Sequence, residues 1–219
     1  MAEVHFFLIV ETVLLFGASL CGFIASITIG VTRDKLGGCP LYGEISWYNA
    51  TAPTLDHFGS SSSCNFCVGV QVIAALYALG FAFFHIYVLI KREDKNTRIV
   101  PPLLVNTGLT IIIFIQACVV SVGFLQWCKS IEYKDVISEC REGQRKLLPS
   151  RPEMDFSSFF DYLTLGESTS WFSFLFWGAL VVVCIVRRCR DNSMPDDHTA
   201  EERKPVLGPS LTPSPSVPS

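Results

Sequence analysis

The chain has 219 residues, of which 50% are hydrophobic and 17% are charged, and its formal net charge is −3. Soluble domains carry roughly 25% charged residues, so this composition is typical of an integral membrane protein with one membrane domain. The small negative charge gives no support to a nucleic-acid partner, and the lipid bilayer is the first partner that we expect.

Four long apolar segments follow one another along the chain. A bilayer core about 30 Å thick is crossed by roughly 17–25 residues of helix, and each segment reaches that length. Inside hydrocarbon, a single segment satisfies its own backbone hydrogen bonds only as a helix. We therefore expect an all-α bundle of four transmembrane helices within a membrane domain of residues 1–190. The expected helices cover Phe6–Val31, Cys67–Ile90, Pro101–Trp127 and Ser170–Val186.

Small residues recur at every fourth position of the first two predicted helices. They are Ala18, Gly22, Ser26 and Gly30 in the first helix, and Ala74, Ala78 and Ala82 in the second. Such stripes let helix backbones approach closely in a membrane. We expect these two helices to pack on each other, and a homo-oligomer formed through one stripe is the alternative.

Five of the nine cysteines lie in or beside the two long loops between the predicted helices. In an oxidising compartment such cysteines pair. The simplest arrangement closes each loop with one disulfide, Cys39–Cys64 in the first and Cys128–Cys140 in the second. Cys67 is then left over, and it could replace Cys64 as the partner of Cys39. Because Cys64 and Cys67 make only half a zinc site, we expect no metal and no cofactor.

Three features together predict the orientation in the membrane. Basic residues are dense in the short connection Lys91–Arg98 and directly after the last helix at Arg187–Arg190, and such density marks the cytoplasmic side. The sequon Asn49-Ala50-Thr51 predicts a glycan in the first long loop. Together with the loop cysteines, these features place both long loops in the lumen or outside the cell, and both termini in the cytoplasm.

The second long loop ends in an aromatic stripe with helical spacing, formed by Phe156, Phe159, Phe160 and Leu163. This stripe predicts either a helix lying on the surface of the membrane or a segment packed on the end of the bundle. Ser168, Thr169 or Ser170 is expected to cap the last helix.

The segment from Asp191 to Ser219 is charged at first and then rich in proline and serine. It cannot bury a core, so residues 191–219 are expected to form a disordered cytoplasmic tail. Cys189 lies among arginines just before this tail and is a candidate palmitoylation site.

Three polar side chains interrupt the apolar segments: Glu11, His85 and Asn106. Each lies five residues inside the cytoplasmic end of its segment, at a shared depth of about 7 Å. A buried carboxylate is costly in a membrane unless it is paired, so we expect an intramembrane polar cluster. We favour a structural clamp, and a proton-sensitive switch is the alternative.

Three short segments resemble the transmembrane protein 179 family. They are Cys39–Gly43 (CPLYG), Val120–Phe124 (VSVGF) with Trp127-Cys128 after it, and Ser170-Trp171. The first segment and the chain length resemble the B branch more closely. The resemblance implies a multi-pass protein of a secretory vesicle or the plasma membrane, and it supplies no known activity or catalytic residue.

The sequence contains no phosphate-binding glycine loop, no HExxH and no GxSxG, so we expect no enzyme and no catalytic residue. The leading hypothesis is a non-enzymatic glycoprotein that organises a membrane or binds a membrane-protein partner. In architecture alone it resembles four-span proteins of the tetraspanin, claudin and synaptophysin types, whose specific signatures are not evident. The alternative is a small channel or transporter that uses the polar cluster.

Overall fold

The computed structural model describes residues 2–49, 52–91, 103–132, 137, 139–146 and 155–193. Its elements in chain order are α1 (Ala2–Leu36), β1 (Cys39–Asn49), β2 (Ala52–Gly59), α2 (Ser61–Lys91), α3 (Leu103–Ile131), α4 (Cys140–Lys146) and α5 (Phe159–Ser193). Among the described residues, α1, α2, α3 and α5 are the helices long and apolar enough to cross a membrane. The predicted bundle of four membrane helices is therefore confirmed.

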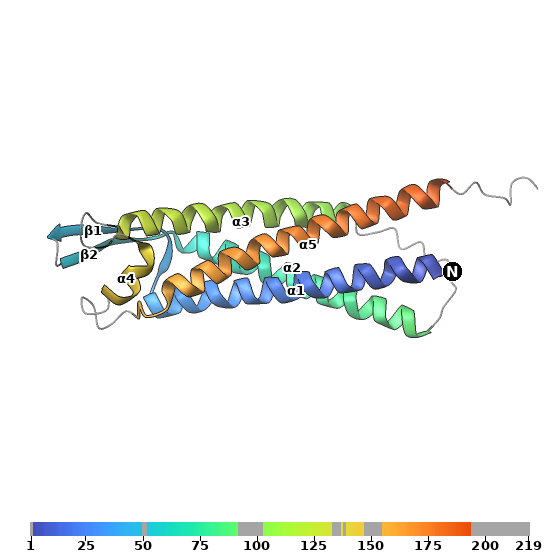
Figure 1. Cartoon of the computed structure of the whole chain (residues 1–219), viewed down its shortest axis with the longest axis horizontal. Coiled ribbons are helices and arrows are strands. Elements are labelled where there is room, and N and C mark those ends of the chain that lie inside the picture. The colour runs from blue at the N-terminus through green and yellow to red at the C-terminus, as the bar shows by residue number, and fades with distance from the viewer. Residues whose placement is uncertain are drawn as a thin grey trace, which may run out of the picture.

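The four long helices run side by side in an elongated bundle (Figure 1). At one end lie β1, β2 and α4, which we call the hairpin cap, while α1 begins and α5 ends at the opposite end. α1 packs extensively on α2 and on α5. α3 packs on α5 and on β1, and its contact with α2 is smaller. The first and last helices are therefore neighbours.

The helices extend beyond the predicted spans on the side of the hairpin cap. α1 and α3 end later, while α2 and α5 begin earlier, than the apolar segments suggest. The added turns carry Leu36, Ile131 and Leu163, which are fully buried at 0% exposure. Because these turns pack under the cap, contacts within the protein extend the helices beyond the length that the bilayer requires.

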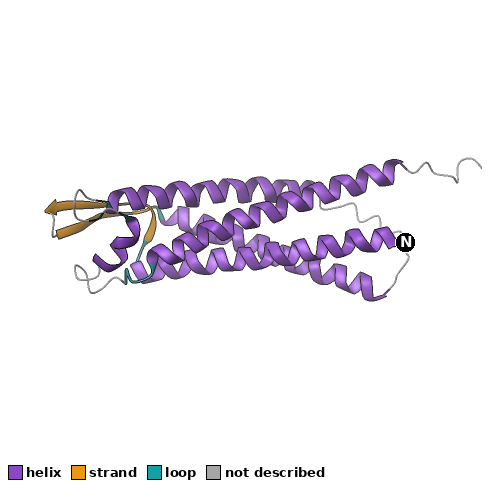
Figure 2. Ribbon diagram, in the orientation of Figure 1, coloured by secondary structure: helices purple, strands orange, loops and turns teal. Residues whose placement is uncertain are grey.

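The first long loop forms an antiparallel β-hairpin, which the sequence analysis did not predict (Figure 2). β1 and β2 pair with Glu44 opposite His57 and Ile45 opposite Leu55. The register shifts between Cys39 and Glu44, where the first strand is irregular. Within the described residues, a protein that is otherwise helical thus carries a two-stranded sheet at the end of the bundle.

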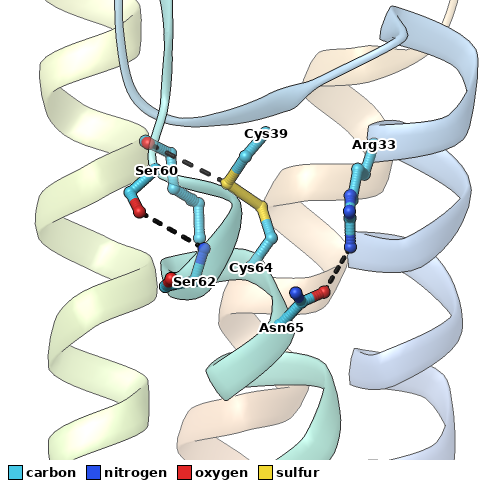
Figure 3. Close-up of a disulfide and its surroundings, with 7 residues drawn as sticks. Arg33, Cys39, Ser60, Ser62, Cys64 and Asn65 are labelled. Carbon is cyan, nitrogen blue, oxygen red and sulfur yellow. Dashed lines mark hydrogen bonds between the residues drawn. A yellow bond between two sulfur atoms is a disulfide. The ribbon is translucent and has the colours of Figure 1, made fainter.

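Two disulfides fix the hairpin cap to the helices. Cys39 at the start of β1 is bonded to Cys64 in the first turns of α2, with an S–S distance of 1.99 Å (Figure 3). Cys128 near the end of α3 is bonded to Cys140, the first residue of α4, at 2.03 Å. Both predicted pairings are confirmed, and Cys67 is a buried free thiol. Each bridge is expected to stabilise the fold by roughly 2–4 kcal/mol.

The aromatic stripe of the second loop packs on the end of the bundle, as one of the two interpretations predicted. Phe156, Phe159 and Leu163 are buried in the same cluster as the disulfide cysteines, and Phe160 packs against them. α5 begins at Phe159 and runs straight into the membrane span. The alternative of a separate helix on the membrane surface is therefore wrong.

The start of α5 is capped by a side chain from α4. Gln144 Oε1 accepts hydrogen bonds from the backbone N–H groups of Phe160 at 3.0 Å and Asp161 at 3.3 Å. These are among the first N–H groups of the helix, which have no partner within it. The predicted cap at Ser168–Ser170 is wrong, because these residues lie well inside α5, where Ser170 Oγ donates to the carbonyl of Gly166.

An ion pair joins the end of α1 to the segment before α5. Lys35 Nζ lies 3.0 Å from Asp155 Oδ2, and the backbone N–H of Asp155 donates to the carbonyl of Lys35 at 3.1 Å. Hydrogen bonds from Ser157, together with Lys35, lower the pKa of Asp155 to about 2. The carboxylate is therefore charged at physiological pH, and α1 and α5 are held together beneath the cap.

The hairpin docks on α3 through two glycines that leave room for neighbouring side chains. A Cβ placed on Gly123 would lie 2.9 Å from Leu41 Cβ and 3.0 Å from Tyr42 Cε2. A Cβ placed on Gly43 would lie 2.6 Å from Cζ3 of Trp127. Tyr42 has a φ of 64°, in the left-handed region that non-glycine residues rarely adopt. Close packing on α3 holds β1 in this bend.

We predict that Gly123→Val loosens the hairpin cap, because the added carbons would overlap Leu41 and Tyr42. Overpacking of this kind costs about 1–3 kcal/mol of the free energy of unfolding. The measurement is thermal unfolding of the purified protein in detergent. Gly108→Val is the matched control, since a Cβ at Gly108 of the same helix meets nothing within 4 Å. Equal melting temperatures for the two variants would contradict the docking.

Candidate functional site: a buried polar cluster between the helices

A hydrogen-bond network of four buried side chains lies in the middle of the bundle. Gln71 Nε2 donates to Gln116 Oε1 at 2.7 Å, which joins α2 to α3. Gln116 Nε2 donates to Ser170 Oγ at 3.3 Å, and Ser173 Oγ donates to Gln71 Oε1 at 3.4 Å, which brings in α5. All four residues have 0% exposure. The network thus ties three helices together at one level of the membrane.

The first helix approaches this network through its small residues. A Cβ added at Gly22 would lie 3.2 Å from both the carbonyl oxygen and Oε1 of Gln71, and 3.1 Å from Ala75 Cβ. Ala18 of α1 lies in one apolar cluster with Ala74 and Ala78 of α2. Packing between the first two helices accounts for this part of the small-residue stripes.

Glu11, at the opposite end of the bundle from the cap, is paired with an arginine. Its side chain is only 6% exposed, and its Oε2 lies 3.3 Å from Arg187 Nη1 of α5. Arg187 Nη1 also donates to Oε1 at 3.5 Å. His85 Nδ1 of α2 lies 4.0 Å from Oε2, beyond hydrogen-bond distance. The partner that the sequence analysis missed is therefore Arg187, which it counted only as a topology signal.

Asn106, on α3, is the third residue of the predicted cluster, after Glu11 on α1 and His85 on α2. It is 3% exposed, and its Nδ2 donates to Cys184 Sγ of α5 at 3.7 Å. Glu11, His85 and Asn106 line one small cavity of about 20 Å³, together with Leu15, Tyr77, Phe81, Leu180 and Cys184. The structure thus brings the three predicted residues together and adds Arg187 and Cys184 to them.

An apolar layer separates this polar cluster from the glutamine network. It contains Leu15 and Ala18 from α1, three alanines from α2, Ile113 from α3, and Trp177 and Leu180 from α5. Ile113 and Trp177 have 0% exposure. Along α2, α3 and α5, these residues lie between those of the two polar levels, and along α1 they lie between Glu11 and Gly22. The side chains therefore alternate between polar and apolar levels along the bundle.

The structure describes the other predicted sites only in part. Asn49 is the last residue of β1, while Ala50 and Thr51 of the sequon lie outside the described residues. Cys189 is exposed near the end of α5. Residues 191–193 continue that helix, and the remaining tail of residues 194–219 lies outside the described residues. Within the described ranges, no group of three or more metal-ligating side chains comes together.

Comparison with known proteins identifies the family. A family model described as the Transmembrane protein 179/179B Claudin domain matches residues 7–207. The chain belongs to this family. The transmembrane protein 179/179B match includes all four membrane helices and both disulfides. Of the four-span architectures considered from the sequence, the claudin type is the one that the family description names. No solved structure is detectably similar to the chain.

Several similar proteins carry the name Transmembrane protein 179B, in agreement with the predicted branch of the transmembrane protein 179/179B family. The zebrafish protein (Danio rerio) is 25% identical over 217 residues, which cover 96% of this chain and 94% of the relative. The mouse protein (Mus musculus) is 30% identical over 185 residues, covering 83% and 82%. The human protein (Homo sapiens) is 27% identical over 181 residues, covering 81% of each.

We predict that Glu11 and Arg187 are energetically coupled, because removal of either one leaves the other charge without its partner. In a double-mutant cycle of Glu11→Gln and Arg187→Gln, the coupling free energy should be about 0.5–3 kcal/mol. Unfolding in detergent, followed by circular dichroism, measures it. The control is a second cycle that combines Glu11→Gln with Arg188→Gln, since Arg188 is the exposed neighbour of Arg187. If both cycles give the same coupling, the ion pair does not contribute to stability.

Proposed function

We propose that this chain is a non-enzymatic four-span membrane protein that binds a membrane-protein partner through its hairpin cap and so organises the surrounding membrane. The observation that carries this proposal is the way in which the cap is fixed. Two disulfides and the close packing of Leu41 and Tyr42 on Gly123 hold it on the bundle. A surface that is already ordered loses little conformational freedom when it binds a partner.

The cap also presents polar side chains outside the membrane helices. Glu44, Asp56 and His57 are exposed, and Ser46 donates a hydrogen bond to Asp56 across the two strands. Polar and charged groups of this kind give specificity more than affinity in a protein interface. They are therefore suited to selecting one partner among the many proteins of a membrane.

The packing inside the bundle favours this proposal over a channel or transporter. An open conduction path needs polar groups or water along its length, and an apolar constriction closes it by excluding water. The apolar layer around Ile113 and Trp177 interrupts the polar levels within one chain. The polar cluster of Glu11, His85 and Asn106 then acts as a clamp between helices, as the favoured interpretation of the sequence has it.

We also propose an orientation and a compartment for the protein. Disulfides persist in oxidising compartments, so we place the hairpin cap in the lumen or outside the cell, and both termini in the cytoplasm. The basic residues at the end of α5 support this orientation. A secretory vesicle or the plasma membrane is the proposed location, with Asn49 glycosylated and Cys189 as a candidate for palmitoylation.

We predict that Asn49→Gln removes a glycan and increases mobility on gels to that of the glycosidase-treated protein. The measurement compares wild type and variants expressed in animal cells, with and without glycosidase. Thr51→Ser, which keeps the sequon, should retain the slower form, and Thr51→Ala should lose it. An unshifted wild type whose Cys39 and Cys64 are freely alkylated in intact cells would overturn the orientation.

A second experiment tests partner binding through the cap. A photo-activatable residue at Asp56 or His57 should give a cross-linked product of one discrete mass in cells, because both positions are exposed on β2. The double variant Cys39→Ser/Cys64→Ser should lose this product. The matched control is Ile73, which is 67% exposed on the membrane-spanning α2 and should not give it.

A flux measurement on the purified protein in liposomes distinguishes the proposed function from that of a channel or transporter. We expect a tight bilayer with no pH-dependent ion flux. Flux that is lost in Glu11→Gln, together with no cross-linked product from the cap, would replace our proposal with the transporter.

A further inference from the structure

Two buried polar atoms at the cavity beside Glu11 have no hydrogen-bond partner among the described residues. They are His85 Nδ1 on α2 and Asn106 Oδ1 on α3. Both residues line the cavity of about 20 Å³ between the helices. A buried polar atom that lacks a partner is costly, and most such atoms in proteins bind another group or an ordered water.

We propose that this cavity binds one water molecule, which bridges His85 Nδ1 and Asn106 Oδ1. This inference goes beyond the proposed function and does not depend on it. The centre of a water molecule needs roughly 10–15 Å³ of free space, so a cavity of about 20 Å³ has room for one water. The water would connect α2 to α3, whose direct contact is smaller than that between α1 and α2.

Hydrogen-bond chemistry fits water at this position. The Asn106 oxygen accepts one hydrogen of the water. A neutral imidazole with its proton on Nε2 accepts the other hydrogen at Nδ1, and the opposite tautomer donates from Nδ1 to the water oxygen. A water molecule therefore satisfies His85 in either tautomer, which a group that only donates or only accepts could not do.

The surroundings disfavour other small ligands. The Arg187 guanidinium lies 3.3 Å from Glu11 Oε2, so the two opposite charges compensate each other. The cavity therefore offers no unpaired charge that would bind a cation or an anion. Leu15, Phe81 and Leu180 line the rest of the cavity with apolar side chains. A single neutral molecule that both donates and accepts is the ligand that remains.

The test detects a long-lived water beside the His85 ring by NMR. The full chain is prepared in nanodiscs with isotope-labelled histidine, and His85→Gln assigns one of the four histidine signals. The readout is magnetisation transfer from water to the carbon-bound ring proton next to Nδ1, which does not itself exchange with solvent. The wild type should show this transfer.

Matched variants decide whether the water occupies the proposed site. Asn106→Leu keeps the approximate shape but removes the acceptor, so the transfer should be lost. Val122→Leu is the control, because Val122 is 53% exposed on the same helix and should leave the signal unchanged. Should Asn106→Leu not fold, Cys184→Met fills the cavity from α5 and should abolish the transfer as well.

Two results would overturn the proposal. One is a folded wild type, judged by its amide spectrum, without transfer to His85. The other is transfer of undiminished intensity in a folded Asn106→Leu or Cys184→Met variant, which would mean that the water lies elsewhere.

Discussion

Polar side chains inside a membrane must find partners on neighbouring helices, and this constraint fixes how the four helices of this protein face each other. Gln71 and Gln116 bond across α2 and α3, and Ser170 and Ser173 reach them from α5. Gly22 brings the backbone of α1 against Gln71. Rotation of α2, α3 or α5 would bury an amide or a hydroxyl group without a partner. The glutamine network therefore sets the rotation of these three helices, which their apolar surfaces alone do not fix.

The two ends of the bundle are held by different means. At the cap, covalent bonds and dense packing dominate, and the disulfide to Cys140 places α4 so that Gln144 caps α5. At the opposite end, the ion pair of Glu11 with Arg187 joins α1 to α5. An ordered cap on a bundle that is clamped at its far end is consistent with a role in presenting a surface to a partner.

The sequence predicted the features that depend on local composition. Apolar length revealed the four spans, and the position of cysteines in polar loops led to both disulfides. Features that depend on tertiary contacts were missed. The hairpin forms where Gly43 and Gly123 permit β1 to dock on α3, and no strong alternation of residues marks its strands. Arg187 was read as a charge at a membrane boundary, because its pairing with Glu11 requires knowledge of which helices are neighbours.

The pairing of the first helix with the last has a consequence for biosynthesis. Glu11 and Arg187 are 176 positions apart, so almost the whole chain must be synthesised before they can meet. Until α5 enters the membrane, the carboxylate of α1 lacks its guanidinium partner within the bilayer. A truncated or wrongly inserted copy would keep this unpaired group. The ion pair can thus form only in a chain whose first and last helices are both in the membrane.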